Sequence, residues 1–298
     1  MTVLAAIALP AAVLVDEELL ALAAGDEHFT LHRGARDGGR ADFDLLAVGE
    51  QKDLIESDGA LILGACDKIT NNPKGIAFLQ SAEGLTRRAQ RLVVDRKALA
   101  REFTHADISP DFRPNGSIDP TDADYVALKT KGFADYHLVV DGLVDHPLSL
   151  SLADLRAMPP RTQITRHDCV EGWSSIGKWT GARLGPLVDK AGLKKNARYI
   201  VFHCGDTLEE TLDGSGQYYE SIDLIDAYHP QTILAYAMND RVLPVAHGAP
   251  LRLRVERQLG YKQAKYIMRI EAVDDYSHLG RGNGGFWEDR GYEWYAGI

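Results

Sequence analysis

The sequence predicts an α+β fold, in which strands and short helices are mixed rather than alternating as regular βαβ units. Two observations lead to this prediction. Short runs of apolar and β-branched side chains have the pattern of strands, and the helical patterns between them are short and irregularly spaced. The chain has 298 residues, enough for one large domain or two modest ones, and it contains no internal repeat.

The first half of the chain contains few regular elements. Residues 81–100 predict a helix, because apolar side chains recur there with helical spacing. These side chains are Ala82, Leu85, Ala89, Leu92 and Val93. Residues 104–120 are rich in Pro, Asp and Gly and predict an extended connection. A strand is expected over 136–143, followed by a short capped helix over 151–155.

The second half is expected to alternate strands with short helices up to its end. The predicted strands cover 161–167, 199–203, 251–256 and 266–273. The predicted helices cover 184–191, 222–227 and 232–238. The strand at 251–256 alternates Leu with Arg in a period of two.

The net charge of −10 is concentrated at the N-terminus. Residues 1–60 contain twelve acidic and four basic side chains, so the remaining chain is nearly balanced. A nucleic-acid surface needs an excess of Lys and Arg, so no nucleic-acid partner is expected. One local exception lies between residues 251 and 270. The six cations there, against the single acid Glu256, are Arg252, Arg254, Arg257, Lys262, Lys265 and Arg269.

The three cysteines, Cys66, Cys169 and Cys204, are widely spaced and include no CxxC pair, which argues against a disulfide framework or a structural zinc site. Around Cys169, the residues 165–174 (TRHDCVEGWS) place a cation and an imidazole just before the thiol. These groups would lower the thiol pKa and favour the thiolate that binds metals. The alternative is a small buried cysteine without chemistry.

The run 169–174 (CVEGWS), with Trp179-Thr180-Gly181 shortly after it, resembles the metal-binding segment of the sulfite-oxidase-fold molybdopterin oxidoreductases. The bacterial branch, which includes periplasmic protein-methionine-sulfoxide reductase catalytic subunits, is nearer than the animal enzymes. Further matching motifs are His229-Pro230-Gln231-Thr232, Leu243-Pro244, Gly248-Ala249-Pro250-Leu251-Arg252 and Gly260-Tyr261-Lys262. The resemblance covers residues 100–298, the expected molybdopterin-binding domain, and leaves residues 1–99 as an N-terminal extension, partly helical.

The resemblance implies a molybdenum-molybdopterin cofactor, one per chain, with Cys169 as the protein thiolate on the metal. It suggests Cys169 and His167 as the catalytic residues, with His167 beside Cys169 and facing the cofactor, and with a satisfied core histidine as the competing interpretation. It also implies that cationic side chains and backbone amides bind the phosphate of the cofactor. The implied activity is oxygen-atom transfer coupled to two-electron redox chemistry. The cofactor-binding residues that it suggests are Asn115, Cys204, His247, Arg252, Lys262 and Lys265.

Two of these positions depart from the family pattern. His247 replaces an asparagine and Cys204 a threonine of the reductase branch, and Cys204 can equally be a core residue. For Arg254, Arg257 and Arg269, a solvated face or local salt bridges are expected instead of cofactor contacts. The aromatic run 284–297 is expected to fold back over the core as part of the domain.

The implied substrate is a small or protein-bound sulfur compound or N-oxide. The sequence has no CxxCH haem motif, so electrons are expected to pass to or from another protein, such as a cytochrome. Animal relatives carry a dimerisation domain for which no room remains after residue 298, so a monomer is expected. Two alternatives stay open: a hydrolase with Cys169 as nucleophile, and a binding protein that kept the fold and lost the metal.

The family suggests a periplasmic location, but the sequence shows no recognisable export signal, and a cytoplasmic location stays open. Residues 1–15 are apolar without a basic start, and Leu63-Gly64-Ala65-Cys66 resembles a degenerate lipoprotein box. Arg87-Arg88 is not followed by the apolar run of a twin-arginine signal.

Overall fold

A computed structural model describes residues 73–298. Its α-helices are α3 (Pro73–Val93), α4 (Ala123–Thr130), α5 (Leu152–Ala157), α6 (Leu184–Ala191) and α7 (Leu224–Ala227). Its strands are β1 (His137–Gly142), β2 (Leu148–Ser151), β3 (Pro160–Asp168), β4 (Ser174–Arg183), β5 (Tyr199–Thr207), β6 (Gln217–Asp223), β7 (Ile233–Met238), β8 (Arg241–Val242), β9 (Arg252–Arg254) and β10 (Ile267–Val273). The motifs at 1–15 and 63–66 lie outside the described residues.

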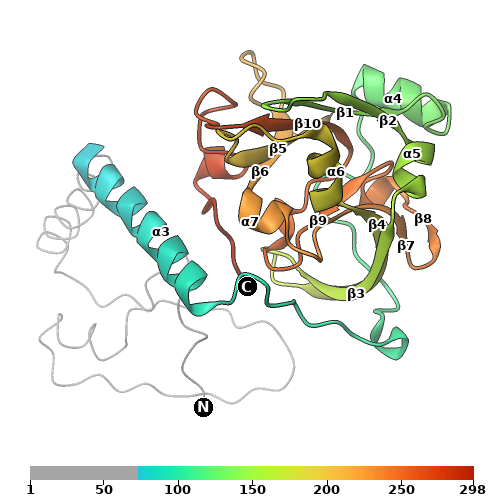
Figure 1. Ribbon diagram of the computed structural model, residues 1–298, viewed down its shortest axis with the longest axis horizontal. Helices are drawn as coiled ribbons and strands as arrows, with labels where there is room; N and C mark the ends of the chain where they lie inside the picture. Colours follow the sequence, from blue (N-terminus) through green and yellow to red (C-terminus); the bar gives the residue numbers. More distant parts are fainter. Residues whose placement is uncertain (1–72) are drawn as a thin grey trace, which may run out of the picture. The chain divides into compact units, whose positions relative to one another are not determined.

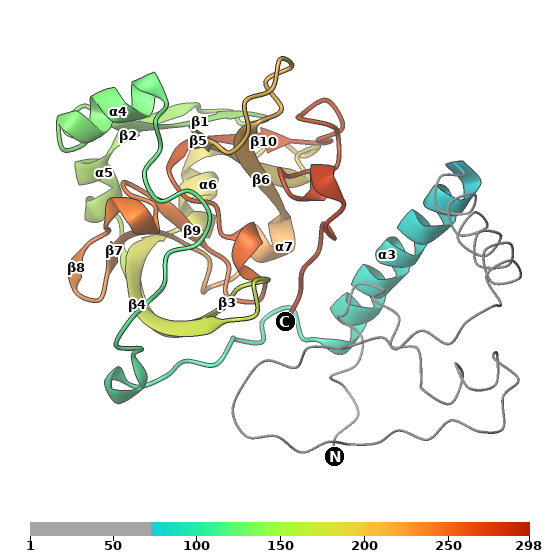
Figure 2. The same cartoon turned by 180° about the vertical axis from the view of Figure 1, so that it is seen from behind.

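The strands form two sheets. The first has the order β2-β1-β10-β5-β6, with β1 and β10 parallel and the other pairs antiparallel. The second has the order β3-β4-β7-β8, and β9 also pairs with β7, at residues 233–235, while β8 pairs with residues 237 and 238. Both views place α6 between the sheet of β1, β5 and β10 and the sheet of β3 and β4 (Figures 1 and 2). This mixture of strands and short helices is the predicted α+β class.

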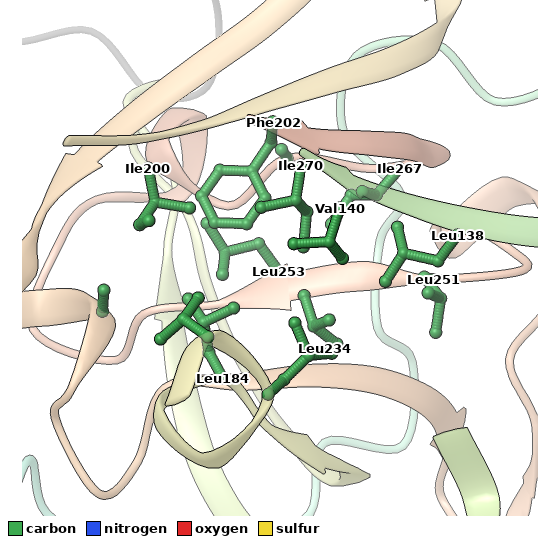
Figure 3. Packing of buried hydrophobic residues seen from close by; sticks show 14 of the residues in the cluster. Leu138, Val140, Leu184, Ile200, Phe202, Leu234, Leu251, Leu253, Ile267 and Ile270 are labelled. Carbon is green, nitrogen blue, oxygen red and sulfur yellow. The ribbon is translucent and has the colours of Figure 1, made fainter. Parts of the chain in front are cut away.

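The hydrophobic core lies between the two sheets and is built from both. Phe202 and Ile270 of the first sheet, Leu234 and Leu253 of the second, and Leu184 of α6 lie together (Figure 3). All five side chains are fully buried. Each contributes roughly 1.5–3 kcal/mol by leaving water.

Local signals explain why several elements form where the sequence predicts them. The Ser151 hydroxyl accepts a hydrogen bond from the Asp154 backbone N–H at 3.1 Å and caps α5. Helix α6 buries Leu184, Leu187 and Val188 on one stripe and ends at Gly192, whose φ of 71° favours glycine. The strands predicted at 136–143, 161–167, 199–203, 251–256 and 266–273 are also present, as β1, β3, β5, β9 and β10.

Two predicted helices were wrong in whole or in part. Residues 233–238 form β7, which pairs with both β4 and β9. Because Ile233, Leu234 and Ala235 are all fully buried, their continuous apolar run has no alternation that would separate a strand from a helix. In the segment 222–227, Ile222 and Asp223 end β6 and only the four following residues are helical.

Strand β4 was not predicted, because glycines interrupt its apolar pattern. A Cβ on Gly181 would lie 2.2 Å from the Leu234 carbonyl oxygen, so β7 approaches β4 closely at this position. Glycine is needed at this position because of packing between the two strands, and the hydrophobic periodicity of the sequence does not reveal such a need.

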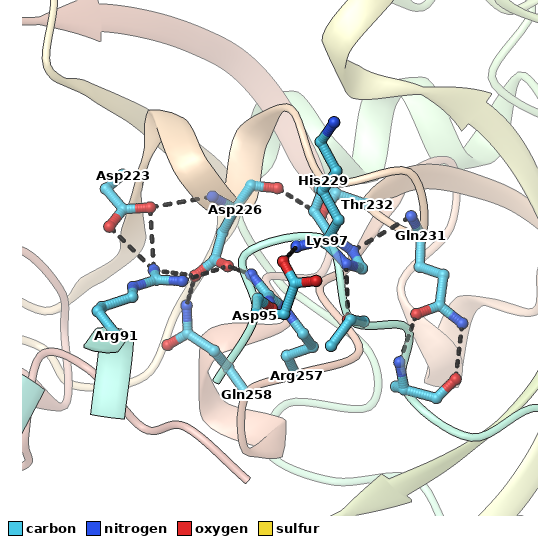
Figure 4. A network of polar contacts seen from close by, with 12 residues as sticks. Arg91, Asp95, Lys97, Asp223, Asp226, His229, Gln231, Thr232, Arg257 and Gln258 are labelled. Atoms are coloured by element: carbon cyan, nitrogen blue, oxygen red, sulfur yellow. Dashed lines mark hydrogen bonds and ion pairs between the residues drawn. The ribbon is translucent and has the colours of Figure 1, made fainter. Parts of the chain in front are cut away.

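Helix α3 and the segment after it are attached to the domain through a buried carboxylate, Asp226 of α7 (Figure 4). Arg91 of α3 forms ion pairs with Asp226 at 2.8 Å and with Asp223 at 2.9 Å. Arg257 and Gln258 bind the same Asp226 side chain at 2.9 and 2.6 Å. Arg91 of the N-terminal extension therefore contacts the domain, while the boundary at residue 100 stays a prediction. Within 73–298, no helix combines the length and the apolar character needed to cross a membrane.

Candidate functional site

A cleft opens beside Cys169 at the end of β3 and collects residues from distant parts of the chain. It is lined by Asn115, Gly116, Ser117, Cys169, Val170, Glu171, Asp206, Leu208, Tyr218, Gly260, Tyr261, Gln263, Lys265 and Trp287. These residues come from the segment before α4, the exit of β3, strands β5 and β6, the segment 260–265 and the C-terminal segment. The cleft therefore lies where several loops meet on one scaffold.

Cys169 is held by a tight turn. Its backbone N–H donates to the Trp173 carbonyl at 2.9 Å, and its carbonyl accepts from the Gly172 N–H at 3.1 Å. Gly172 has a φ of 84°, which explains glycine at this position. The side chain is only 9% exposed, so the sulfur is held at the wall of the cleft by a fixed backbone.

The expected lowering of the Cys169 pKa by its two preceding neighbours is wrong for the protein without cofactor. Burial raises the pKa of the thiol. Arg166 points to Asp168, with which it forms an ion pair at 2.8 Å, and burial lowers the pKa of His167, so that its ring is neutral. Of the nearby cations, Arg252 is the one that lowers the pKa of Cys169. A metal ion would stabilise the thiolate directly, since a coordinating thiol is deprotonated.

His167 is fully buried behind the cleft wall. Its Nδ1 lies 3.2 Å from Arg254 Nη1, which is always a donor, so Nδ1 accepts and Nε2 carries the proton. This Nε2–H has no acceptor that meets hydrogen-bond geometry among residues 73–298, although the Gln263 side chain is close enough to raise the pKa of His167 against the effect of burial. A Cβ on Gly260, which lines the cleft, would lie 2.6 Å from Nε2. Because Gly260 has no side chain, the Nε2–H of His167 lies close to the cleft.

Arg252 and Arg254 alternate with leucine in the sequence, but their surroundings differ. Both are fully buried. Arg254 Nη2 pairs with Glu256 at 2.6 Å. Arg252 forms no ion pair in the described chain: it donates to the His247 carbonyl at 3.2 Å and to the Asn115 side-chain oxygen at 3.3 Å, and its Nε has no partner. A buried guanidinium without a carboxylate indicates a place for an anion.

Lys265 is the second buried cation at this place. Its ammonium donates to the carbonyl oxygens of Asn115 at 2.7 Å and Ala246 at 3.0 Å, and also to that of Ser117. It forms no ion pair within the described residues, and burial together with Arg252 lowers its pKa to about 7. An anion between Arg252 and Lys265 would restore the ordinary charge of this lysine.

The model of the family called oxidoreductase molybdopterin binding domain matches residues 125–279, just over half of the chain. The chain belongs to this family. The match confirms the resemblance drawn from the sequence, together with the fold, the class of molybdopterin-dependent oxidoreductase and the molybdopterin cofactor.

Curated relatives of this molybdopterin-binding chain are bacterial. A putative protein-methionine-sulfoxide reductase subunit, YedZ1, of Azospira oryzae is 40% identical over 164 residues, which are 55% of this chain and 56% of that protein. The protein-methionine-sulfoxide reductase catalytic subunit MsrP of Xanthomonas campestris pv. campestris is 34% identical over 165 residues, covering 52% of this chain and 50% of that protein. The chain therefore spans about half the length of the curated relatives it matches.

Among solved structures, the sulfane dehydrogenase SoxCD of Paracoccus pantotrophus is similar to this chain, with a TM-score of 0.42 and 23% identity. The similarity covers 47% of this chain and 39% of that chain.

The predicted site residues of the molybdopterin-binding domain fall into two groups. Cys169, Asn115 and Lys265 line the cleft. Arg252 is hydrogen-bonded to Asn115 and to the His247 backbone, so these residues form one cluster with Lys265, while His167 lies behind Gly260. The His247 ring is neutral, because burial and Arg252 lower its pKa to about 4, and its Nδ1 has no partner among the described residues.

Two predicted cofactor ligands lie elsewhere. Lys262 is fully buried and forms ion pairs with the buried carboxylates of Glu220 and Glu288. Its charge is therefore used inside the protein. Cys204 is a member of the hydrophobic core, and burial raises the pKa of its thiol well above the usual range. Neither side chain lines the cleft.

Three residues of the cleft were not among the predicted site residues. Asp206 is buried and lines it, and so does Gln263, whose Oε1 has no partner within 73–298. Tyr218, which no motif had placed, also lies in its wall and donates from its hydroxyl to the Tyr261 carbonyl at 2.5 Å. The position of Asp206, two residues after Cys204 on the same strand, was the available signal.

Proposed function

We propose that this chain binds molybdenum-molybdopterin in the cleft, with Cys169 as the protein ligand of the metal, and that it catalyses two-electron oxygen-atom transfer. The observation that supports this proposal best is the pair of buried cations, Arg252 and Lys265, that have no carboxylate partner and meet at Asn115. Burying two unpaired cations is costly unless an anion is bound there. The phosphate of a pterin cofactor is such an anion.

The polar atoms around the cleft fit the rest of the cofactor. Arg252 Nε is a buried donor without a partner in the described structure. His167 Nε2, a donor, and Gln263 Oε1, an acceptor, lie near each other but have no partner that meets hydrogen-bond geometry there. A heterocyclic ring with amide-like edges needs both kinds of group. The buried Cys169 thiol on its rigid turn supplies one soft ligand of the type that molybdenum-sulfur centres require.

Each part of the site would have a separate task. Bound there, the cofactor supplies the two-electron redox chemistry. Cys169 would fix the position of the metal, Arg252 and Lys265 would hold the anionic end, and Trp287 and Leu208 form apolar parts of the same wall. The protein thereby contributes position and electrostatics.

The proposed substrate class is a sulfoxide, because the curated relatives are described as protein-methionine-sulfoxide reductases. In that direction, one sulfoxide, two protons and two electrons give one thioether and one water. The electrons would come from an external electron-transfer protein, as expected from the sequence. A periplasmic location and a monomeric state remain predictions from the family resemblance.

The cysteine-hydrolase alternative finds less support in the geometry. A nucleophilic thiol needs an imidazole within hydrogen-bond reach. In the described chain, no histidine hydrogen-bonds the Cys169 sulfur, and the ring of His167 is bound by Arg254 instead. Burial also raises the pKa of Cys169, which disfavours the nucleophilic thiolate.

The experiment that tests the proposal compares cofactor content in wild type, Arg252→Met and Arg241→Met, all expressed in a host that makes molybdopterin. Arg241 is exposed on β8 and serves as a matched control. Molybdenum by mass spectrometry and oxidised pterin by fluorescence are expected near one per chain in wild type and the control, and severalfold lower in Arg252→Met. A folded wild type without molybdenum or pterin would overturn the proposal and favour a binding protein that lost the metal.

A further inference from the structure

The cleft contains one buried acidic side chain, Asp206 of β5, which no motif or family resemblance had marked. It is 3% exposed and lines the same cleft as Cys169 and Lys265. The other acid of the cleft, Glu171, is exposed to solvent, and its Oε2 accepts a hydrogen bond from the Trp173 indole at 2.9 Å. Asp206 is therefore the acid of this cleft that is withdrawn from water.

Asp206 is also incompletely satisfied. Its Oδ1 has no hydrogen-bond partner within residues 73–298, and the side chain forms no ion pair there. A buried carboxylate with an unpaired oxygen is costly, so such a group either takes up a proton or meets a partner that arrives from outside. Asparagine would fill the same space without this cost. The acid is thus poorly explained by folding alone.

The surroundings of Asp206 balance its two protonation states near neutral pH. Burial raises its pKa to about 7 even though the Lys265 ammonium acts in the opposite direction, and the nearby Asp122 carboxylate adds to the increase. The charged and titratable groups that interact electrostatically with it are Lys265, Asp122, Tyr125, Cys204, Tyr218 and Tyr266. Burial raises the pKa values of Tyr218 and Cys204 well above the usual range, so both stay protonated at neutral pH.

The proposed reaction requires a group of this kind. Reduction of one sulfoxide consumes two protons and two electrons and releases one thioether and one water, and oxidation in the reverse direction releases the same two protons. A group that gives or takes protons works best when its pKa lies near the working pH. Tyr218 is too weak an acid, and the Cys169 thiolate would be occupied by the metal.

We propose that Asp206 is the carboxyl group that delivers protons to the cleft during sulfoxide reduction and accepts them in the reverse direction. This inference rests on the proposed function. The carboxylic acid of Asp206 gives a proton to the oxygen atom that leaves as water, and it is protonated again from solvent for the second transfer. The electrons arrive separately, from the external electron-transfer protein through the cofactor.

The first readout is independent of turnover. Infrared difference spectra between acidic and alkaline pH, recorded on the cofactor-loaded protein, follow the carbonyl stretch of protonated carboxyl groups. Wild type is expected to show a band that disappears with a midpoint near pH 7, and Asp206→Asn is expected to lack it. Asp122→Asn keeps one of the two oxygens that accept hydrogen bonds from Thr207 but removes a negative charge, so it is expected to move the midpoint to lower pH.

The second readout is the pH profile of methyl sulfoxide reduction with a chemical electron donor. Because the protonated acid is the donor, wild-type kcat is expected to fall as the pH rises through about 7. Asp206→Asn is expected to lower kcat by about 10²-fold or more with little change in KM. The kcat of this variant is also expected to lose its fall with rising pH. Asp206→Glu is expected to restore part of the rate and the fall of kcat with rising pH. If Asp206 had only a structural role, Asp122→Asn would not shift the pH at which kcat falls.

Molybdenum content, measured on the same samples, separates the two proposals. Wild type and Asp206→Asn with equal molybdenum and the same pH profile would overturn the role of Asp206 and leave the proposed function standing. An infrared band that persists in Asp206→Asn would do the same. Wild type without molybdenum and without sulfoxide reduction would overturn both.

Discussion

Replacing Lys262 by methionine is expected to destabilise the protein strongly without acting through the cofactor. The Lys262 ammonium lies 2.5 Å from Glu220 and is also paired with Glu288, and all three side chains are at most 1% exposed. Although burial alone would lower the pKa of Lys262, the two carboxylates raise it, so the lysine is charged in the folded state. Methionine fills similar volume but leaves the buried carboxyl groups of Glu220 and Glu288 without their cation. Burial and Glu288 already raise the pKa of Glu220 well above its usual range, against the opposite effect of Lys262.

Removing one partner of a buried ion pair costs about 3–5 kcal/mol. For a domain of this size, 1 kcal/mol corresponds to roughly 2–4 °C in Tm, so a decrease of roughly 6–20 °C is expected. The assay is thermal unfolding followed by circular dichroism. The matched control is the triple variant Lys262→Met/Glu220→Gln/Glu288→Gln, which removes the two charges together with their cation and is expected to recover most of the loss. The reasoning is refuted if Lys262→Met unfolds within roughly 2 °C of wild type. It is also refuted if the single variant keeps its Tm but loses its molybdenum.

Three further predictions concern single contacts. Ser151→Ala removes the cap of α5 and is expected to lower the free energy of unfolding by about 1 kcal/mol in chemical denaturation, whereas Ser151→Asp should keep the cap. Asp226→Asn should lower stability at pH 7: burial alone would raise the Asp226 pKa, but Arg91 and Arg257 lower it below the unfolded value. The stability that Asp226 contributes is thus fully present above the unfolded pKa and is lost as the pH falls through the folded pKa. Below about pH 4, the Tm of the variant should therefore fall less steeply with decreasing pH than that of wild type. An equally steep fall of Tm in both proteins would contradict this. Gly260→Ala places a Cβ 2.6 Å from His167 Nε2 and is expected to reduce molybdenum content in folded protein, with normal content as the contrary result.

The sequence was sufficient where the determining signal is local. The cap at Ser151 lies within a few consecutive residues, and the capped helix was predicted. Helix α6 was predicted with its observed bounds, because its apolar stripe and its terminal glycine are adjacent in the chain. The family motifs are short runs of the same kind.

The sequence was insufficient where distant residues decide the environment. Arg252 and Arg254 look alike, but Arg254 has Glu256 as its partner and Arg252 does not. Lys262 and Lys265 are three residues apart, yet Lys262 meets carboxylates that are 42 and 26 residues away in the chain. Burial of Asp206, and the strand pairing on both edges of β7, likewise follow from tertiary contacts only.

The measurement that tests the central claim most directly is the number of sulfur neighbours of molybdenum, obtained by X-ray absorption spectroscopy on wild type and Cys169→Ser. Serine keeps the size and the turn but replaces the soft sulfur by a hard oxygen. The account predicts that wild-type molybdenum has one more sulfur neighbour than the variant, which either loses the metal or binds it through oxygen. The same number of sulfur neighbours in a variant that retains molybdenum would contradict the assignment of Cys169 as the metal ligand.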